Sequence, residues 1–375
     1  MTIEIPKELK PKDGRFGCGP SKVRTEAFAK VAEQAGTLLG TSHRQAPVKQ
    51  LVKRVREGTA ALFSLPEDYE VVLGNGGATC FWDIATFCLI RNKSQHLSFG
   101  EFSSKFASAA KAAPHLEDPV VIKSDYGTHP EAVADESVDV YAFTHNETST
   151  GVAMETIKRP LDASGKAASG LVLVDATSGA GGLRFDPRET DAYYFAPQKS
   201  FGSDGGLFIA VMSPAAIERS KKIGESGRFI PAFLDLNTAI DNSRLDQTYN
   251  TPSIVTLAVM AEQIDWFNEN GGLEWAASRS DKSAEIIYGW AERSDFASPF
   301  AAKAEDRSHV VATIDFNDDI DATQIAKTLR QNGIVDTEPY RKLGRNQLRV
   351  AMFPGIDPED IESLTACIDY VVSNL

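Results

Sequence analysis

The sequence has few cysteines, and their spacing matches no zinc-binding pattern. Four occur in 375 residues: Cys18, Cys80, Cys88 and Cys367. A chain of this length can bury enough apolar surface to fold without a disulfide framework. We therefore expect buried or incidental thiols, and we expect no metal site.

A long apolar run and an excess of basic residues are also missing. No stretch of about 18 uncharged apolar residues occurs, so no membrane span is expected. The opening MTIEIPKELKPKDGRFG lacks the basic region, apolar core and cleavage site of a secretory signal, which predicts a cytoplasmic protein. The net charge of −13 argues against nucleic acid or an anionic membrane as a partner. An anionic substrate would need a local cluster of Arg, Lys or His.

Short apolar runs alternate with amphipathic helices, a pattern typical of an α/β fold. Apolar residues at helical spacing predict a helix over residues 45–64. The runs that predict strands are residues 69–74, 138–145, 171–176, 191–196 and 207–212. Because these runs are apolar throughout, they favour a mostly parallel, mixed sheet with helices on both faces.

The pattern changes after about residue 255. A long helix is predicted over residues 253–270, before Gly271 and Gly272, and a second over residues 273–293. Two strands follow at 309–316 and 347–353, with helices between and after them. We predict three parts: an N-terminal extension (1–15), a large cofactor-binding domain (16–265) and a smaller C-terminal α+β domain (266–375).

Polar residues stand where several predicted strands end. Asp175 closes one strand, Gln198 and Lys199 follow another, 76-GGAT-79 leads from a strand into a helix, and 145-HNET-148 follows a fourth. Ligands bind at this edge of an open parallel sheet. Each feature alone has an ordinary explanation: Asp175 could cap a turn, Lys199 could reach solvent, and the glycine loop lacks the spacing of a dinucleotide fingerprint or P-loop.

Taken together, these features suit pyridoxal phosphate. The phosphate needs a helix N-terminus, the pyridinium nitrogen needs a carboxylate that keeps it protonated, and the aldehyde needs a lysine. Lys199 follows Asp175 by 24 positions (199 − 175), which leaves room for one connection and one strand. A lysine at the end of a buried strand is tolerated if an imine replaces its ammonium group.

The chain resembles the phosphoserine aminotransferases of the fold-type-I pyridoxal-phosphate superfamily, in particular their actinobacterial branch. The resemblance extends in order through nearly the whole chain. Its stretches are FGCGPSKV (16–23), LLGTSHRQAPVK (38–49), GNGGAT (74–79), HNETSTGV (145–152), VDATSGAGG (174–182), YYFAPQKSFGSDGG (193–206), TYNTPSI (248–254) and EPYRKLGRNQLRVAMF (338–353).

The resemblance implies how the cofactor is held. Lys199 would form the Schiff base and Asp175 would pair with the pyridinium nitrogen. Phe102 would stack on the ring, and Thr148 would contact the phenolic oxygen. The cofactor phosphate would be held by Gly77, Ala78 and Gln198 and, from the second subunit of a homodimer, by Asn250 and Thr251.

It also implies how substrates are held. Arg349 would grip the α-carboxylate, while His43 and Arg44 would meet the distal phosphate or γ-carboxylate. The better-known branch has an arginine where this chain has Ala78, and a His-Arg pair near 341-RKLGR-345. Lys342 and Arg345, with Arg341, are candidate replacements for the substrate phosphate, and a solvated charged surface is the alternative for these residues.

The implied activity is amino transfer between L-glutamate and 3-phosphohydroxypyruvate, giving O-phospho-L-serine in L-serine biosynthesis. The alternatives are other fold-type-I enzymes, an alanine–glyoxylate aminotransferase or a cysteine desulfurase, since one fold serves many functions. A non-catalytic relative would be expected to lose Lys199 or Asp175, and both are present. A nicotinamide dehydrogenase is disfavoured because its glycine fingerprint is missing.

Overall fold

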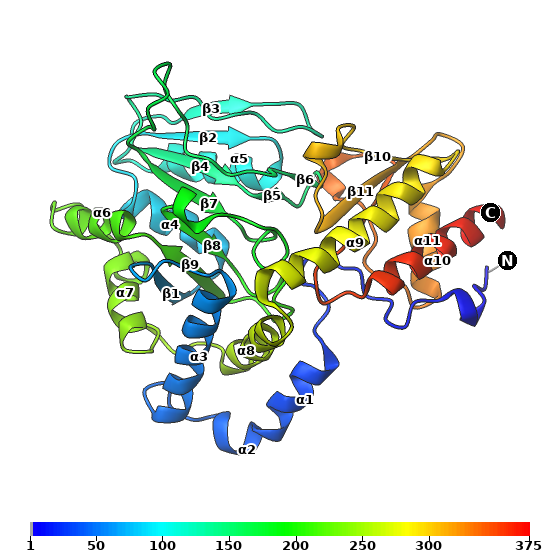
Figure 1. Cartoon of the computed structure of the whole chain (residues 1–375), viewed down its shortest axis with the longest axis horizontal. Coiled ribbons are helices and arrows are strands. Elements are labelled where there is room, and N and C mark those ends of the chain that lie inside the picture. The colour runs from blue at the N-terminus through cyan, green and yellow to red at the C-terminus, as the bar shows by residue number, and fades with distance from the viewer. Residues whose placement is uncertain (1–2) are drawn as a thin grey trace.

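Two sheets of different size organise the computed structural model, which describes residues 3–375 (Figure 1). The larger sheet has seven strands. In spatial order they are β1 (Glu70–Asn75), β9 (Leu207–Met212), β8 (Ala192–Phe195), β7 (Leu171–Asp175), β4 (Val140–Thr144), β2 (Ser94–Ser98) and β3 (Val120–Lys123). The pairs from β8 to β3 are parallel, whereas β9 is antiparallel to both β8 and β1. This confirms the predicted mostly parallel, mixed sheet.

Side chains along the central strands point alternately to the two faces of the sheet, and they pack into two separate apolar cores. In β7, Val172 and Val174 join the core beneath one face, whereas Leu171 and Leu173 join the core beneath the other. The first face carries α3 (Ala46–Leu62), α8 (Ile254–Glu269) and α1 (Thr25–Glu33), and the second carries α4 (Ala78–Cys88), α5 (Glu101–Ala112), α6 (Pro214–Gly224) and α7 (Leu236–Arg244). Because side chains alternate, Asp175 at the end of β7 falls on the α4 face.

The smaller sheet lies at the C-terminal end of the chain and is antiparallel. Its strands are β10 (Ala297–Pro299), β11 (Val311–Phe316) and β12 (Gln347–Ala351), and its helices are α10 (Ala322–Gln331) and α11 (Pro358–Ser373). The long helix α9 (Gly272–Arg293) runs from α8 to this sheet (Figure 1). Ile5, near the N-terminus, packs into the same core. The domain limits predicted at 15/16 and 265/266 stay predictions.

Several shorter elements complete the fold. These are α2 (Ala35–Leu38), the strand pair β5 (Asn146–Glu147) and β6 (Val152–Ala153), and the 3-10 turns η1 (Lys7–Leu9), η2 (Pro187–Glu189), η3 (Ala232–Leu234), η4 (Ala304–Asp306) and η5 (Arg341–Leu343). All four cysteines are free. Among the described helices, none combines the length and hydropathy that a membrane crossing requires. No cluster of metal-ligating side chains occurs within residues 3–375.

Candidate active site

A cavity of about 230 Å³ opens at the edge of the large sheet where β4, β7 and β8 end. It lies between these strand ends and the N-terminus of α4. Of the residues predicted to form the site, seven line it: Gly77, Ala78, Phe102, Thr148, Asp175, Gln198 and Lys199. Segments more than 100 residues apart in the sequence therefore meet in one cavity, as expected for the carboxyl edge of a parallel sheet.

Asp175 is a buried carboxylate held by three donors. Its Oδ2 accepts a hydrogen bond from Trp82 Nε1 at 2.8 Å. Its Oδ1 accepts from the backbone N–H of Thr177 at 3.0 Å and from the Thr177 hydroxyl at 2.5 Å. Burial raises the pKa of Asp175 above its usual value, and these hydrogen bonds oppose part of that rise. A cation placed against the carboxylate would keep it ionised.

Lys199 is partly buried, and its amine lies beside the N-terminal segment. Nζ donates to the backbone carbonyl of Cys18 at 2.5 Å. A side chain at Gly19 would place its Cβ 1.9 Å from this amine and would displace it, and the φ of 140° at Gly19 also favours glycine. Burial lowers the pKa of Lys199 to about 8. The neutral, nucleophilic form of this amine is therefore more populated near neutral pH than in an exposed lysine.

The N-terminus of α4 forms an anion cradle. Gly76 and Gly77 have φ angles of 130° and 127°, which side-chain-bearing residues rarely adopt. Within the described chain no side chain caps α4, so the N–H groups of its first turn face outward. Gln198 Oε1 is buried beside the cavity and has no hydrogen-bond partner among residues 3–375. This oxygen can accept only from a donor group, whereas the amide nitrogen of Gln198 can donate to an anion.

The ring of Phe102 is placed by a buried carboxylate, Glu147, which the sequence analysis named within 145-HNET-148 but gave no role. Glu147 is 0% exposed, and its Oε2 accepts from the backbone N–H groups of Phe102 at 3.0 Å and Ser103 at 2.9 Å. The charge thus sits at the N-terminus of α5, where the helix dipole favours an anion. Ser149 donates to its other oxygen at 2.7 Å. Glu147 thereby fixes the first turn of α5 against the β5 segment.

A hydroxyl and an arginine lie on the opposite wall. Thr148 Oγ1 donates to Ser178 Oγ at 2.7 Å. Arg349, on β12, donates from Nη1 to the Thr148 carbonyl at 3.2 Å. Its Nε is buried without a hydrogen-bond partner in the part of the chain that the structure describes. The small sheet therefore brings one cation with unused donors to the edge of the cavity.

Four predicted residues lie together, outside the set that lines the cavity. Thr251 Oγ1 and His43 Nδ1 are 3.3 Å apart, and Arg44 Nη1 donates to Gln247 Oε1 at 2.6 Å. Asn250 joins this group through its backbone N–H, which donates to the Asn75 side chain at the end of β1 at 3.3 Å. His43, Arg44, Asn250 and Thr251 thus form one surface unit within a single chain.

Lys342 and Arg345 have partners of their own. Lys342 pairs with Glu101, the residue before Phe102, so it lies near the rim of the cavity. Arg345 pairs with Asp315 and stacks on the Phe300 ring, 4.5 Å from its centroid. The structure does not bring Arg345 to the cavity. Lys342 and Arg345 are each paired with a carboxylate.

Trp82 and the Cys18 carbonyl are site groups that sequence reasoning missed. Trp82 is 93 positions from Asp175, and Cys18 is 181 positions from Lys199. One signal was available for Trp82: it lies four residues after Ala78, so one helical turn separates it from the predicted cradle. For Cys18 there was no such signal, because a backbone carbonyl leaves no trace in residue identity.

Replacing Trp82 with phenylalanine should raise the pKa of Asp175 further. The variant keeps the apolar bulk but removes one of three donors to a buried carboxylate, worth about 1.5–3 kcal/mol. The measurement is a titration of the Asp175 carboxyl carbon by NMR in cofactor-free protein. Phenylalanine at Trp290, which donates to Asp369 in the C-terminal part of the chain, is the matched control. An unchanged Asp175 pKa in Trp82→Phe would contradict the expectation.

The residues present fit pyridoxal phosphate. The amine of Lys199, with its lowered pKa, suits an aldehyde, and the carboxylate of Asp175 suits a protonated ring nitrogen. The uncapped N-terminus of α4 suits the phosphate, and the amide nitrogen of Gln198, which lines the same cavity, can donate to it. Three chemically different groups therefore surround one cavity in the arrangement that this cofactor requires.

Comparisons with known proteins agree with this chemistry. The family model described as aminotransferase class-V matches residues 21–337. A protein from Nocardioides sp., named phosphoserine aminotransferase, is 61% identical over 374 residues, covering 100% of this chain and 99% of the relative. The fold is similar to that of a phosphoserine aminotransferase from Cytophaga hutchinsonii, with a TM-score of 0.85 and 22% identity. The match covers 95% of this chain and 99% of that protein. A phosphoserine aminotransferase with bound pyridoxal phosphate, from Trichomonas vaginalis, matches with a TM-score of 0.79 and 19% identity. The match covers 96% of this chain and 100% of that protein.

Proposed function

The chain belongs to the class-V aminotransferases and, within them, to the phosphoserine aminotransferases, and we propose that its cavity transfers an amino group between L-glutamate and 3-phosphohydroxypyruvate. The products would be 2-oxoglutarate and O-phospho-L-serine, the latter a precursor of L-serine. The enzyme is an aminotransferase that depends on pyridoxal phosphate. The observation that carries the proposal is the cavity that joins Lys199, Asp175 and the α4 N-terminus.

Lys199 would move the proton in the reaction. Bound pyridoxal phosphate supplies an aldehyde for the amino group and a ring that withdraws electrons from the substrate Cα. The amine of Lys199, whose pKa burial lowers to about 8, would in its neutral form take the proton from Cα and return it on the cofactor side. Asp175 would hold a proton on the ring nitrogen, and Phe102 would fix the plane of the ring. Thr148 would donate to the phenolic oxygen.

The cofactor phosphate would lie at the N-terminus of α4. The N–H groups of Gly77 and Ala78 and the amide of Gln198 would donate to it. Ala78 offers no charge, so this chain would rely on backbone groups and on neighbours for neutralisation. Asn250 and Thr251 of a second subunit are the proposed neighbours.

Substrate anions would meet arginines from two directions. Arg349 would hold the α-carboxylate, because its unpartnered Nε lies at the edge of the cavity beside Thr148. His43 and Arg44 would receive the distal phosphate or γ-carboxylate. Lys342 remains a candidate for the phosphate if it leaves Glu101, whereas Arg345 would have to leave Asp315 and Phe300.

A homodimer would bring the surface unit of His43, Arg44, Asn250 and Thr251 to the cavity of the partner. Large apolar side chains are exposed on the same segments: Phe28, Leu39, Leu245, Tyr249 and Val255. Exposed apolar groups of this kind mark a surface that a partner covers. Mixing inactive Lys199→Ala with inactive Asn250→Ala/Thr251→Ala subunits would restore one working site per mixed dimer. No recovery on mixing would count against a shared site.

The predicted cellular location of the protein is the cytoplasm.

Absorption spectra of the purified protein test the reaction. Glutamate should convert the visible band to that of the pyridoxamine form, and 3-phosphohydroxypyruvate should restore it, while glyoxylate should not. Restoration by glyoxylate alone would favour an alanine–glyoxylate aminotransferase and refute the proposed substrate. Release of sulfide from cysteine would favour a desulfurase.

The pH dependence of cofactor capture should report the lowered pKa of Lys199. Only the neutral amine attacks an aldehyde, and with a pKa of about 8 roughly a tenth of it is neutral at pH 7. The capture rate of cofactor-free protein should rise with pH and level off above about 8, as stopped-flow absorbance would record. A rate that kept rising up to pH 10 would mean an ordinary lysine.

A further inference from the structure

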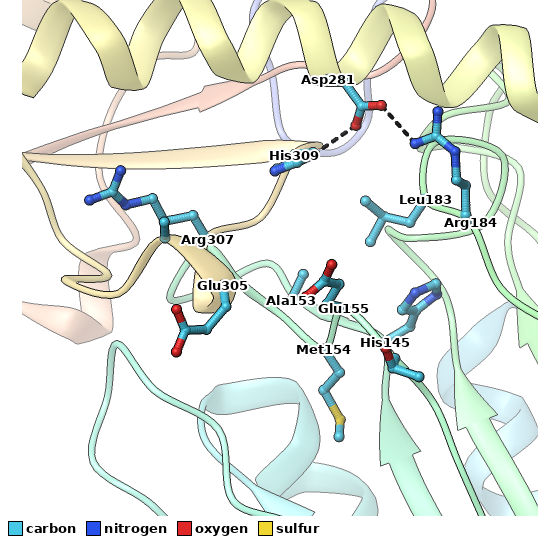
Figure 2. Close-up of a pocket in the computed structure, with 12 residues that line it drawn as sticks. His145, Ala153, Met154, Glu155, Leu183, Arg184, Asp281, Glu305, Arg307 and His309 are labelled. Carbon is cyan, nitrogen blue, oxygen red and sulfur yellow. Dashed lines mark hydrogen bonds and ion pairs between the residues drawn. The ribbon is translucent and has the colours of Figure 1, made fainter.

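A second and larger cavity, of about 390 Å³, lies between the two sheets (Figure 2). One side contributes His145, residues 153–156 and residues 183–184. The other side contributes Asp281 on α9, together with Ala304, Glu305, Arg307 and His309. Cavities of this size class accept small organic molecules. None of the roles proposed above uses this cavity.

The cations at this cavity are already paired. Asp281 joins both sides of it, because its Oδ1 lies 2.7 Å from His309 Nδ1 and its Oδ2 accepts from Arg184 at 2.6 Å (Figure 2). Arg184 also forms a two-bonded pair with Glu274. Arg307 binds Glu292 and two backbone carbonyls. These cations therefore do not form an unpaired positive cluster of the kind that would bind a multiply charged anion.

Two carboxylates at the cavity have no such partners. Glu155 and Glu305 make no hydrogen bond or ion pair with any residue of the described chain, 3–375. They come from opposite sides, Glu155 from the segment after β6 and Glu305 from η4. Acidic groups alone do not define a site. A buried donor on the same wall gives the independent observation.

That donor is His145, which is only 1% exposed and lines the cavity. Its Nδ1 lies 3.0 Å from the hydroxyl of Tyr193, a phenol that is fully buried and has no other hydrogen-bond partner in residues 3–375. Because Nδ1 is the only acceptor that the described residues offer this buried hydroxyl, we assign the phenol as the donor to Nδ1. Burial lowers the pKa of His145 to about 4, so the ring is neutral. Its single proton is then on Nε2, for which residues 3–375 provide no acceptor.

The wall thus combines an unsatisfied N–H donor with unpaired carboxylates, and we propose that the cavity binds a small zwitterionic amino acid at a site separate from catalysis. The carboxylate of the ligand would accept from His145 Nε2–H, with Arg184 and His309 close by. Its ammonium group would pair with Glu155 and Glu305. A ligand with only an amine would leave His145 Nε2–H without an acceptor, and a ligand with only a carboxylate would leave Glu155 and Glu305 unpaired.

The two cavities share one wall. Asn146, the neighbour of His145, lines the cofactor cavity, and the backbone N–H of His145 donates to the Asp175 carbonyl at 2.9 Å. A ligand held by Glu155 and Glu305 would also restrain the segment after β6 against η4. Hydrogen exchange in residues 152–156 and 304–309 should therefore slow when the ligand binds.

The test uses enzyme in the pyridoxamine-phosphate form, which has no aldehyde to react with amines. Calorimetric titration with glycine, L-alanine and L-serine should show one site per chain. Ethanolamine and glycolate should each bind at least about tenfold more weakly, because each lacks one charge. Equal binding of ethanolamine would overturn the carboxylate contact, and no heat with any amino acid would overturn the site.

Variants separate this site from the catalytic one. Glu155→Gln should weaken glycine binding at least about tenfold, whereas Glu136→Gln, at an exposed carboxylate outside the cavity, should not. Arg349→Gln should leave glycine binding intact. Binding that is lost in Arg349→Gln and retained in Glu155→Gln would place the ligand in the catalytic cavity and refute the proposal. This result would leave the proposed aminotransferase function untouched.

Discussion

The Lys199→Ala variant should lose amino transfer almost completely, by at least about 10⁴-fold in kcat. Alanine removes the amine that joins the cofactor and moves the proton at Cα. The change also takes away a group whose burial costs free energy, since the pKa of Lys199 is held at about 8 by desolvation. The fold should therefore survive, and melting of the cofactor-free protein would show it. Rapid-mixing spectra with glutamate measure the loss.

Two controls sharpen this result. Lys221→Ala, at an exposed lysine on α6, should keep full activity. A small primary amine such as methylamine should restore part of the lost proton transfer in Lys199→Ala, because the deleted side chain leaves space beside the Cys18 carbonyl. If Lys199→Ala still turned over at near the original rate, the base would have to be another residue.

The main strands could be predicted because their residues carry a simple pattern. β7, β8 and β9 are apolar throughout and buried on both faces, so the predicted ranges lie within a residue or two of the observed ones. β2 (SQHLS) was not predicted, although it is equally buried. Its polar side chains are satisfied locally and by distant loops: Ser94 lies 2.9 Å from His96, and Gln95 donates to the Val133 carbonyl at 2.8 Å. An apolar pattern cannot reveal such a strand.

The grouping of Asp175, Lys199 and the glycine loop could be predicted for a topological reason. Parallel strands end at the same edge, so residues that follow them meet. What orients these groups could not be read in the same way. Glu147 reaches α5 across 45 positions and Trp82 reaches Asp175 across 93, and neither contact is implied by local spacing. Arg345 was predicted at the site but lies elsewhere. It pairs with Asp315 because of the register between β11 and β12, which local spacing in the sequence does not reveal.

Asp175→Asn should separate cofactor attachment from catalysis. Asparagine has the same shape but no charge, so it cannot hold a proton on the ring nitrogen. Lys199 should still bind the cofactor, while transfer from glutamate should fall at least about 10³-fold. This loss should exceed that of Trp82→Phe, which keeps the carboxylate. Asp204→Asn, at an exposed position shortly after Lys199, is the matched control and should stay active. Single-turnover spectra give both rates.

The pH dependence of cofactor affinity gives a second and independent readout. Burial raises the pKa of Asp175, so in the cofactor-free protein the carboxyl takes up a proton at a higher pH than an exposed aspartate does. Pairing with a protonated ring needs the ionised form, and affinity should therefore fall as the pH drops through that raised pKa. Asp175→Asn has no such proton to take up, so this part of the acid dependence should vanish. If the variant kept both the transfer rate and the acid dependence of the original enzyme, another group would hold the ring nitrogen, and the α4 face of the sheet would no longer be the side on which the ring is activated.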